Sequence, residues 1–365
     1  MARVRLKKQK GDTDKRLLSL ALILTGIGLV AVADASAPQA LNYFDDKLFF
    51  VKQQAVWAVI GLISLTVFSR IHYNFWKKMA KPLFFASLLL LILVLLPQIG
   101  SRVLGARRWI VLGPVSFQPS EIIKLTLALY LAKVADSNKQ ALAYFAPIAL
   151  VAGLVMLQPD LGTTLVIGAV GMAPTFASCV NIFYFLGALT AGGVASFLLI
   201  IFSDYRRERL LTFLEATQDP LGRTYHIRQI LLALGSGGLF GVGLGQSRQK
   251  FLFLPEAATD SIFAIVAEEL GFFGATILII LFAWLVFRGI GIARGAPDTF
   301  SRILAVGILT WIGAQVFLNI GSMVALVPLT GIPLPFLSYG GTALVAILTG
   351  VGILLNISRY ATKQK

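Results

Sequence analysis

Charge, cysteine and histidine are all scarce in this chain. Only 13% of its 365 residues are charged, whereas 57% are hydrophobic. A soluble protein of this length carries more charge. The single cysteine, Cys179, permits neither an intrachain disulfide nor a cysteine metal cluster, and His72 and His226 are too far apart in sequence for a convincing metal site. These shortages argue against a soluble, disulfide-stapled or zinc-binding protein.

Long hydrophobic runs are abundant instead. Many of them reach the roughly 17–25 residues that a helix needs to cross a bilayer. We therefore predict an all-α polytopic membrane protein with about ten transmembrane helices. The first run is predicted to be a span and not a signal peptide, because no A-x-A-like cleavage site directly follows it. The expected helices cover residues 17–34, 53–69, 82–98, 119–136, 142–158, 161–178, 182–203, 260–287, 303–328 and 341–358.

The distribution of lysine and arginine over the loops predicts the orientation. With the N-terminus in the cytoplasm, the inner segments hold 18 basic residues and the outer loops hold 12. This bias favours cytoplasmic N- and C-termini. The expected organisation is a basic cytoplasmic tail at 1–16, one transmembrane domain at 17–358 and a cytoplasmic tail at 359–365. The net charge of +15 is thus spread over membrane loops, and we expect no nucleic-acid partner.

The outer loop at 204–259, between the seventh and eighth expected helices, is long and basic. It carries seven lysine and arginine residues. Its stretch "GSGGLFGVGLGQ" indicates tight turns and close backbone approach. A loop of this length inside a compact domain is usually functional.

Polar residues cluster before and at the start of the fourth expected helix. Arg107 and Arg108 precede it, and Ser120 is a plausible N-cap. Glu121 and Lys124 lie three residues apart on one helix face. They either simply pair, which lowers the cost of placing both in the membrane, or line a polar cavity that reaches in from the outer face.

Two further segments interrupt the apolar runs at the same side. In "LQPDLGTT", Pro159 breaks a helix and Asp160 either caps the next helix or orients groups in a cavity. In "LVPLTGIPLPFLSYGGT", the polar side chains of Ser338 and Tyr339 accompany broken backbone. Irregular backbone at membrane depth is tolerated where it is buried in protein or lines a cavity. The segment is therefore either an architectural turn or part of a cavity wall.

Four acids surround the start of the eighth expected helix, in "PEAATDSIFAIVAEELG". Thr259 or Asp260 could cap this helix, where the helix dipole favours a carboxylate. In a helix that starts here, Glu268 is rotated by about 80° and Glu269 by about 180° from Asp260. We therefore expect Glu268 to share a cavity with Asp260 and Glu269 to pair elsewhere in the bundle. Ionisable residues in membrane segments usually mark function.

All of these features fall on the predicted outer side. Arginine forks suit phosphate, and apolar spans suit a lipid tail. The residues therefore imply an anionic lipid ligand whose head group lies at the outer face.

Five stretches, in order from residue 105 to 342, resemble the SEDS family, which comprises the FtsW, RodA and SpoVE proteins. They are "GARRWIVLGPVSFQPSEIIKL", "QPDLGTT", "DPLGRTYHIRQ", "GSGGLFGVGLGQSRQKFLFLPEAATDSIFAIVAEELG" and "GIPLPFLSYGGT". The fourth stretch is more similar to the FtsW branch than to RodA. The N-terminal hundred residues add little to this resemblance.

The resemblance implies a peptidoglycan glycosyltransferase of the bacterial cytoplasmic (inner) membrane. Its substrate would be lipid II, a disaccharide-peptide on undecaprenyl diphosphate, polymerised at the outer face during septal cell-wall synthesis. Its partners would be a class B penicillin-binding protein and other division proteins. A RodA-like role in elongation is the alternative within the family. Outside it, the alternatives are a lipid II flippase and a non-catalytic scaffold.

The family's catalytic aspartate falls on Asp260, which would act as general base for a sugar hydroxyl. No residue set has metal-ligand spacing, and no cofactor is certain. A divalent cation, Mg or Mn, could bridge the diphosphate and a carboxylate. The residues expected to bind substrate or shape its cavity are Arg107, Arg108, Glu121, Lys124, Asp160, Arg209, Arg248, Lys250 and Ser338.

Overall fold

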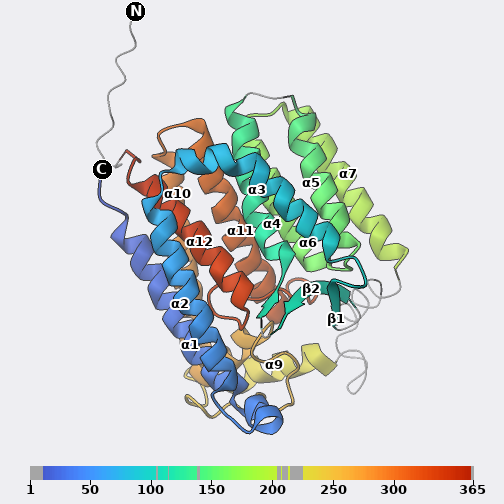
Figure 1. Cartoon of the computed structure of the whole chain (residues 1–365). Coiled ribbons are helices and arrows are strands. Elements are labelled where there is room, and N and C mark those ends of the chain that lie inside the picture. The colour runs from blue at the N-terminus through green and yellow to red at the C-terminus, as the bar shows by residue number, and fades with distance from the viewer. Residues whose placement is uncertain are drawn as a thin grey trace, which may run out of the picture.

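The computed structural model describes residues 11–103, 106–113, 115–137, 140–203, 207, 213 and 225–362. The predicted all-α membrane fold is confirmed, since steeply inclined helices dominate the molecule (Figure 1). Each expected span coincides with one helix. These helices are α1 (Lys15–Phe44), α2 (Phe49–Arg70), α3 (Tyr73–Leu93), α4 (Pro119–Asp136), α5 (Leu142–Met156), α6 (Leu161–Ala177), α7 (Ile182–Ile201), α10 (Ile262–Arg294), α11 (Thr299–Met323) and α12 (Gly341–Ser358).

Length and apolar composition qualify six of the described helices to cross a membrane: α1, α2, α7, α10, α11 and α12. Helices α5 and α6 are apolar but shorter. Several ends differ from the predicted ones. Helix α1 runs to Phe44, past the expected residue 34, and α3 begins at Tyr73 instead of residue 82. Hydropathy detects only the lipid-crossing part of a helix, and these extensions carry polar or basic side chains.

A small sheet, which we did not predict, occupies the loop before α4. Strands β1 (Gly100–Val103), β2 (Ala106–Leu112) and β3 (Val115–Phe117) pair antiparallel in the order β1-β2-β3. Gly113, with φ of +62°, lies in the turn between β2 and β3, where a positive φ suits glycine. The sheet fixes the direction of Arg107 and Arg108 on β2.

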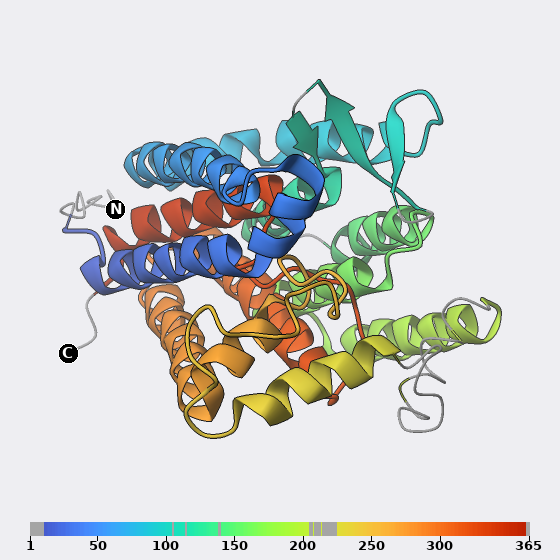
Figure 2. The ribbon, with the colours of Figure 1, turned by 90° about the horizontal axis from the view of Figure 1, so that it is seen from below.

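The long outer loop contains a helix of its own, α9 (Tyr225–Gly237), which we also did not predict. It lies across the lower end of the bundle in Figure 1, and Figure 2 views that end from below. Ile227, Ile230 and Ala233 are buried, and α9 packs chiefly on α10.

Helices α4, α11 and α12 form the centre of the bundle. Most side chains of α4 and nearly all of those of α12 are buried. Helix α12 packs closely along α2, where a Cβ on Gly352 would lie 2.6 Å from the carbonyl oxygen of Leu65. Because these helices are largely buried, polar side chains within the centre must find partners.

The two ends of the described chain meet at the upper end of the bundle in Figure 1. The amide of Asp14 donates to Ser358 Oγ over 3.0 Å, and the amide of Gly11 donates to the carbonyl oxygen of Arg359 over 2.9 Å. Arg288 pairs with Asp14 at 2.9 Å. The starts of α1 and the ends of α10 and α12 are thus held together, opposite the sheet and α9.

Candidate active site

The irregular segment between α11 and α12 is attached to α11 by two side-chain hydrogen bonds. The carbonyl oxygen of Ile332 accepts a hydrogen bond from Asn319 Nδ2 at 2.7 Å, and that of Pro333 accepts one from Gln315 Nε2 at 2.9 Å. Gln315 and Asn319 lie one turn apart on α11. They attach this segment to the helix and satisfy its backbone.

Asp260 lies against the same segment. Asn319 Nδ2 also donates to the backbone oxygen of Asp260, over 2.8 Å. A Cβ on Gly331 would lie 3.3 Å from Asp260 Oδ2, and Gly331 has φ of +67°. The carboxylate is therefore next to backbone that carries no side chain, and it is partly exposed.

Neither Thr259 nor Asp260 caps α10. The helix begins at Ile262, with Ser261 at the cap position and no side-chain cap hydrogen bond. Ser338 Oγ donates to the backbone oxygen of Thr259 over 2.5 Å and accepts from the amide of Leu334 over 2.7 Å. Ser338 is buried, and it joins the backbone immediately before Asp260 to the segment at Leu334.

Lys124, on α4, is completely buried near this site. Its ammonium donates to Glu121 Oε1 at 2.7 Å and to Gln315 Oε1 at 3.0 Å, and it lies 5.3 Å from the centre of the Trp311 ring. The expected pairing of Glu121 and Lys124 is present. Because Gln315 also holds Pro333, the buried ion pair is linked to the segment beside Asp260.

Glu121 keeps one oxygen, Oε2, without a hydrogen bond among the described residues, and the buried Ser120 Oγ is likewise unpartnered there. The expectation that Ser120 caps α4 is wrong. Gln118 occupies the cap position and Pro119 the first helical position, where its missing amide costs nothing. Ser120 is therefore free to face inward as a polar group near Glu121.

Asp160 does cap α6. Its two oxygens accept from the amide and the hydroxyl of Thr163, each at 2.9 Å. Arg108 Nε lies 3.7 Å from Asp160 Oδ2, and the guanidinium donates to the carbonyls of Gln158 and Pro159 at 3.1 and 2.7 Å. The sheet and the start of α6 are thereby joined.

The start of α6 also reaches the segment beside Asp260. A Cβ on Gly162 would lie 2.5 Å from the carbonyl oxygen of Thr330. Residues 330–333 are thus contacted from α6, from α11 and from Asp260. The structure brings Glu121, Lys124, Asp160, Asp260 and Ser338 into one connected region.

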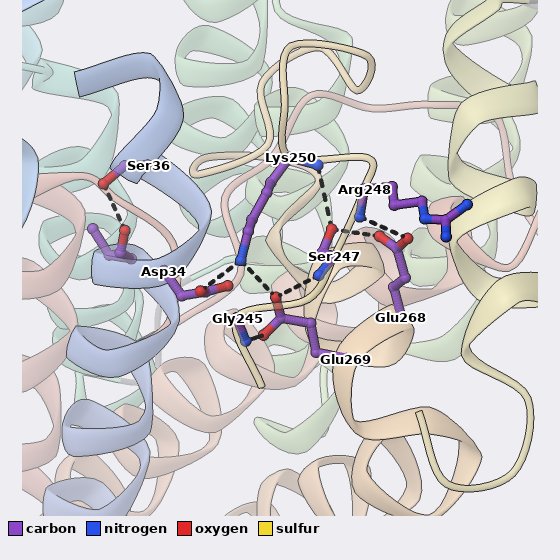
Figure 3. Close-up of polar contacts among 9 residues, drawn as sticks. Asp34, Ser36, Gly245, Ser247, Arg248, Lys250, Glu268 and Glu269 are labelled. Carbon is purple, nitrogen blue, oxygen red and sulfur yellow. Dashed lines mark hydrogen bonds and ion pairs between the residues drawn. The ribbon is translucent and has the colours of Figure 1, made fainter. Parts of the chain in front are cut away.

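Lys250 forms a second polar cluster, shown in Figure 3. Its ammonium lies 2.7 Å from Asp34 Oδ1 on α1 and 2.8 Å from Glu269 Oε1 on α10. Glu269 also accepts from the amides of Gly245 and Ser247, at 3.0 and 3.1 Å. Only 5% of Lys250 is exposed. This geometry favours a structural role for Lys250 over the predicted contact with substrate.

Charge pairing sets the protonation of this lysine. Burial alone would lower the pKa of Lys250, but hydrogen bonds and charge attraction from Asp34 and Glu269 outweigh burial and raise it. Lys250 is therefore cationic at neutral pH.

Glu268 holds the same loop by different contacts. It accepts from Ser247 Oγ at 2.5 Å, from the amide of Arg248 at 3.2 Å and from Ser236 Oγ at 3.4 Å. We expected Glu268 to share a cavity with Asp260 on the assumption that one continuous helix begins at residue 260. Because α10 begins at Ile262, the angle calculated between these two residues does not apply. The expectation that Glu269 pairs elsewhere is confirmed.

The remaining predicted arginines are placed less uniformly. Arg107 is half-buried on β2, and Arg248 is exposed, with its guanidinium pointing away from the Glu268 carboxylate (Figure 3). Arg209 lies outside the described residues.

Three residues of the site escaped the sequence analysis: Asp34, Gln315 and Asn319. Each carried a signal that could have been used. Asp34 is an acid within the apolar run of the first helix, and Gln315 and Asn319 are polar residues one turn apart in an otherwise apolar helix.

The described residues offer no group of three or more histidine, cysteine, aspartate or glutamate side chains that could hold a metal ion. That a divalent cation, Mg or Mn, could bridge the diphosphate and a carboxylate stays a prediction.

The fold and the site define a polytopic helical membrane protein with buried ion pairs and a half-exposed aspartate at one end. A family profile described as "Cell cycle protein", which covers FtsW, RodA and SpoVE, matches residues 15–363. The chain belongs to this family.

Individual relatives agree over nearly the whole length. The chain is 43% identical to stage V sporulation protein E of Bacillus subtilis, over 97% of this chain and 99% of the relative. It is 40% identical to the probable peptidoglycan glycosyltransferase FtsW of Geobacter metallireducens, over 94% of each.

Solved structures agree as well. One, described as "Structural coordination of polymerization and crosslinking by a peptidoglycan synthase complex", matches with a TM-score of 0.78 and 31% identity, over 95% of this chain and 98% of that one. The crystal structure of the rod shape determining protein RodA of Thermus thermophilus matches with a TM-score of 0.71 and 31% identity, over 96% and 98%. The predicted SEDS membership, with likeness to FtsW, is confirmed.

Proposed function

We propose that this chain polymerises lipid II into glycan strands at the outer face of the bacterial cytoplasmic membrane, with Asp260 as the catalytic carboxylate. The broader class follows from its relatives, several of which are named peptidoglycan glycosyltransferases; the chain is an enzyme of this class. The septal role is part of the proposal and is supported by the likeness to FtsW.

The position of Asp260 carries the proposal. Its backbone oxygen accepts a hydrogen bond from Asn319, and its partly exposed carboxylate lies beside Gly331, which carries no side chain. A carboxylate within hydrogen-bond reach of a sugar hydroxyl can take its proton as the new glycosidic bond forms. The bond between the donor sugar and the lipid diphosphate breaks in the same step.

The departing diphosphate needs positive charge nearby. Arg107, Arg108 and Arg248 are the described candidates, and Arg209 is a further one. The guanidinium of Arg108 already donates hydrogen bonds to the carbonyl oxygens of Gln158 and Pro159. Arg248 is therefore the exposed guanidinium best suited to bind phosphate. A class B penicillin-binding protein is the proposed partner, in keeping with the matched structure of a peptidoglycan synthase complex.

Labelled lipid II, the purified protein and its cognate partner provide the first test. We expect polymer from the wild type and none from Asp260→Asn, which keeps the size of the side chain and removes its basicity. Asp136→Asn, at the opposite end of the bundle, is the matched control and should polymerise normally. Normal polymerisation by a folded Asp260→Asn protein would reject the assignment.

Arg248 can be tested in the same assay. We expect Arg248→Gln to lower kcat/KM by about 10-fold to 100-fold, because one charge-assisted contact to the leaving group is worth roughly 1.5–3 kcal/mol. The thermal midpoint should not change, since the side chain is exposed. Arg70→Gln is the control, because Arg70 is also exposed but is the last residue of α2, far from Asp260. Unchanged kinetics would remove Arg248 from the proposal.

A further inference from the structure

The segment that joins α9 to Lys250 has an unusual surface. Residues 229–247 contain no charged side chain, although they belong to an outer loop. Large apolar side chains along it are exposed: Leu231, Leu232, Leu239, Phe240, Val242 and Leu244. A continuous apolar surface of this kind indicates contact with another protein or with a membrane.

Backbone hydrogen bonds fix the level of this segment relative to α10. Gly271, with φ of +66°, interrupts α10. The amide of Phe272, just beyond the break, donates to the carbonyl oxygen of Gly238 at 2.9 Å, and the carbonyl oxygen of Glu268, before it, accepts from the amide of Val242 at 3.0 Å. The break is therefore satisfied within the protein, as lipid surroundings require.

The break lies at the outer margin of the hydrocarbon layer. From Phe272 to Phe287, the last residue before the basic Arg288, the helix extends for about 24 Å at 1.5 Å per residue, against a hydrocarbon thickness of about 30 Å, which puts the break a few ångström inside that margin. Phe272 and Phe273 are exposed on this lipid-crossing part, and the ring of Phe240 lies 5.3 Å from that of Phe273. The apolar surface of the loop is thus continuous with the lipid-facing surface of α10.

We propose that α9 and the turn at 238–244 lie in the plane of the outer leaflet, with their exposed apolar side chains among the acyl chains. Helix α9 crosses the end of the bundle instead of running along it (Figures 1 and 2). Arg228, which is exposed on α9, directly precedes the uncharged stretch and suits a lipid phosphate. If the proposed function holds, this anchor keeps the loop that carries Asp260 at the level of the head group of its substrate.

Spin labels on single cysteines test the anchor without using activity. In a Cys179→Ser background, labels are placed at Leu232→Cys and Phe240→Cys. Ile280→Cys, exposed in the middle of α10, is the lipid reference, and Glu256→Cys, exposed in the outer loop, is the water reference. Collisions with oxygen and with a nickel chelate give the depth of each label in liposomes of phosphatidylcholine and phosphatidylglycerol.

We expect the Leu232 and Phe240 labels to lie about 5–10 Å below the phosphates, the depth of an interfacial helix. Depths that match that of the Glu256 label would overturn the proposal and indicate that the apolar surface lies in water and binds a protein partner. Readings that match Ile280 would overturn it in favour of a deep insertion. Leu231→Cys, on the same face, replaces Leu232→Cys if that variant fails to fold. Because the protein is labelled alone, a failed polymerisation assay leaves the result unaffected.

Discussion

At the residue scale, the ammonium of Lys250 is buried and forms two ion pairs. It lies between Asp34 and Glu269, and its loop backbone bonds to Glu268 and Glu269. Breaking a buried ion pair by removing one partner is costly because the remaining charge is left without compensation.

We therefore expect Lys250→Met to lower the free energy of unfolding by about 3–5 kcal/mol. The matched control is Lys52→Met: Lys52 also lies 2.7 Å from a carboxylate, that of Asp46, but its side chain is 64% exposed. An exposed pair is worth only about 0–1 kcal/mol. Thermal or denaturant unfolding in detergent micelles measures both, and equal losses would contradict the structural role of Lys250.

The residues of the site could be predicted unevenly from sequence. Acids and bases in apolar runs were conspicuous, so that Glu121, Lys124 and Asp260 were found. The partners contributed by distant parts of the chain were not found: Gln315 for Lys124, Asn319 for the backbone of Asp260, and Asp34 for Lys250, which is 216 residues away. No local periodicity encodes such a contact.

At the scale of elements, the interruption of α10 depends on two glycines. A Cβ on Gly241 would lie 2.0 Å from the carbonyl oxygen of Glu269, and one on Gly271 would lie 2.3 Å from the amide nitrogen of Gly241. Both residues have positive φ. The two backbones meet where neither can carry a side chain.

We expect Gly241→Ala to destabilise the protein by at least about 2 kcal/mol, from the left-handed backbone and from the clash together. Gly235→Ala is the matched control. Nothing lies within 4 Å of its Cβ in α9, and alanine should add about 0.5–1 kcal/mol there. Unfolding midpoints of opposite shift are the expected outcome, and a neutral Gly241→Ala would show that the turn is not tightly packed.

The elements themselves were largely predictable because a lipid-crossing helix needs a long apolar run. The sheet and α9 were missed for the opposite reason. Strand β3 has three residues and β1 has four, too short for a clear alternation. Helix α9 has 13 residues, which is shorter than the lipid-crossing runs that predicted the other helices. The break at Gly271 was also missed, since a single glycine in an apolar run does not by itself end a helix.

At the scale of the whole molecule, the arrangement predicts which parts face which side. The start of α1 and the end of α12 meet at one end of the bundle, and the sheet and α9 lie at the other (Figure 1). Asp260 directly precedes α10, on which α9 packs. Cys179 follows the end of α6, whereas the start of α6 lies near Asp260. Cys179 therefore lies at the end opposite Asp260, which the loop charges predict to be the inner one.

We expect a membrane-impermeant maleimide to label Glu256→Cys in intact spheroplasts, in a Cys179→Ser background, and to leave native Cys179 unmodified. Both side chains are exposed, so that a difference in labelling reflects the side of the membrane on which each lies and not burial within the protein. Permeabilised cells provide the control, in which Cys179 should react. Labelling of Cys179 in sealed cells would reverse the orientation deduced from the loop charges.

The contact between Asp34 and Lys250 also has a consequence in time. Helix α1 is synthesised first, and 216 further positions must follow before the lysine emerges, which takes about 10–40 s at 5–20 residues per second. During that interval α1 carries an acid into the bilayer with no cation to meet it, at a cost of up to about 3 kcal/mol. The first helix to enter the membrane therefore completes this ion pair only after the loop that carries Lys250 has been synthesised.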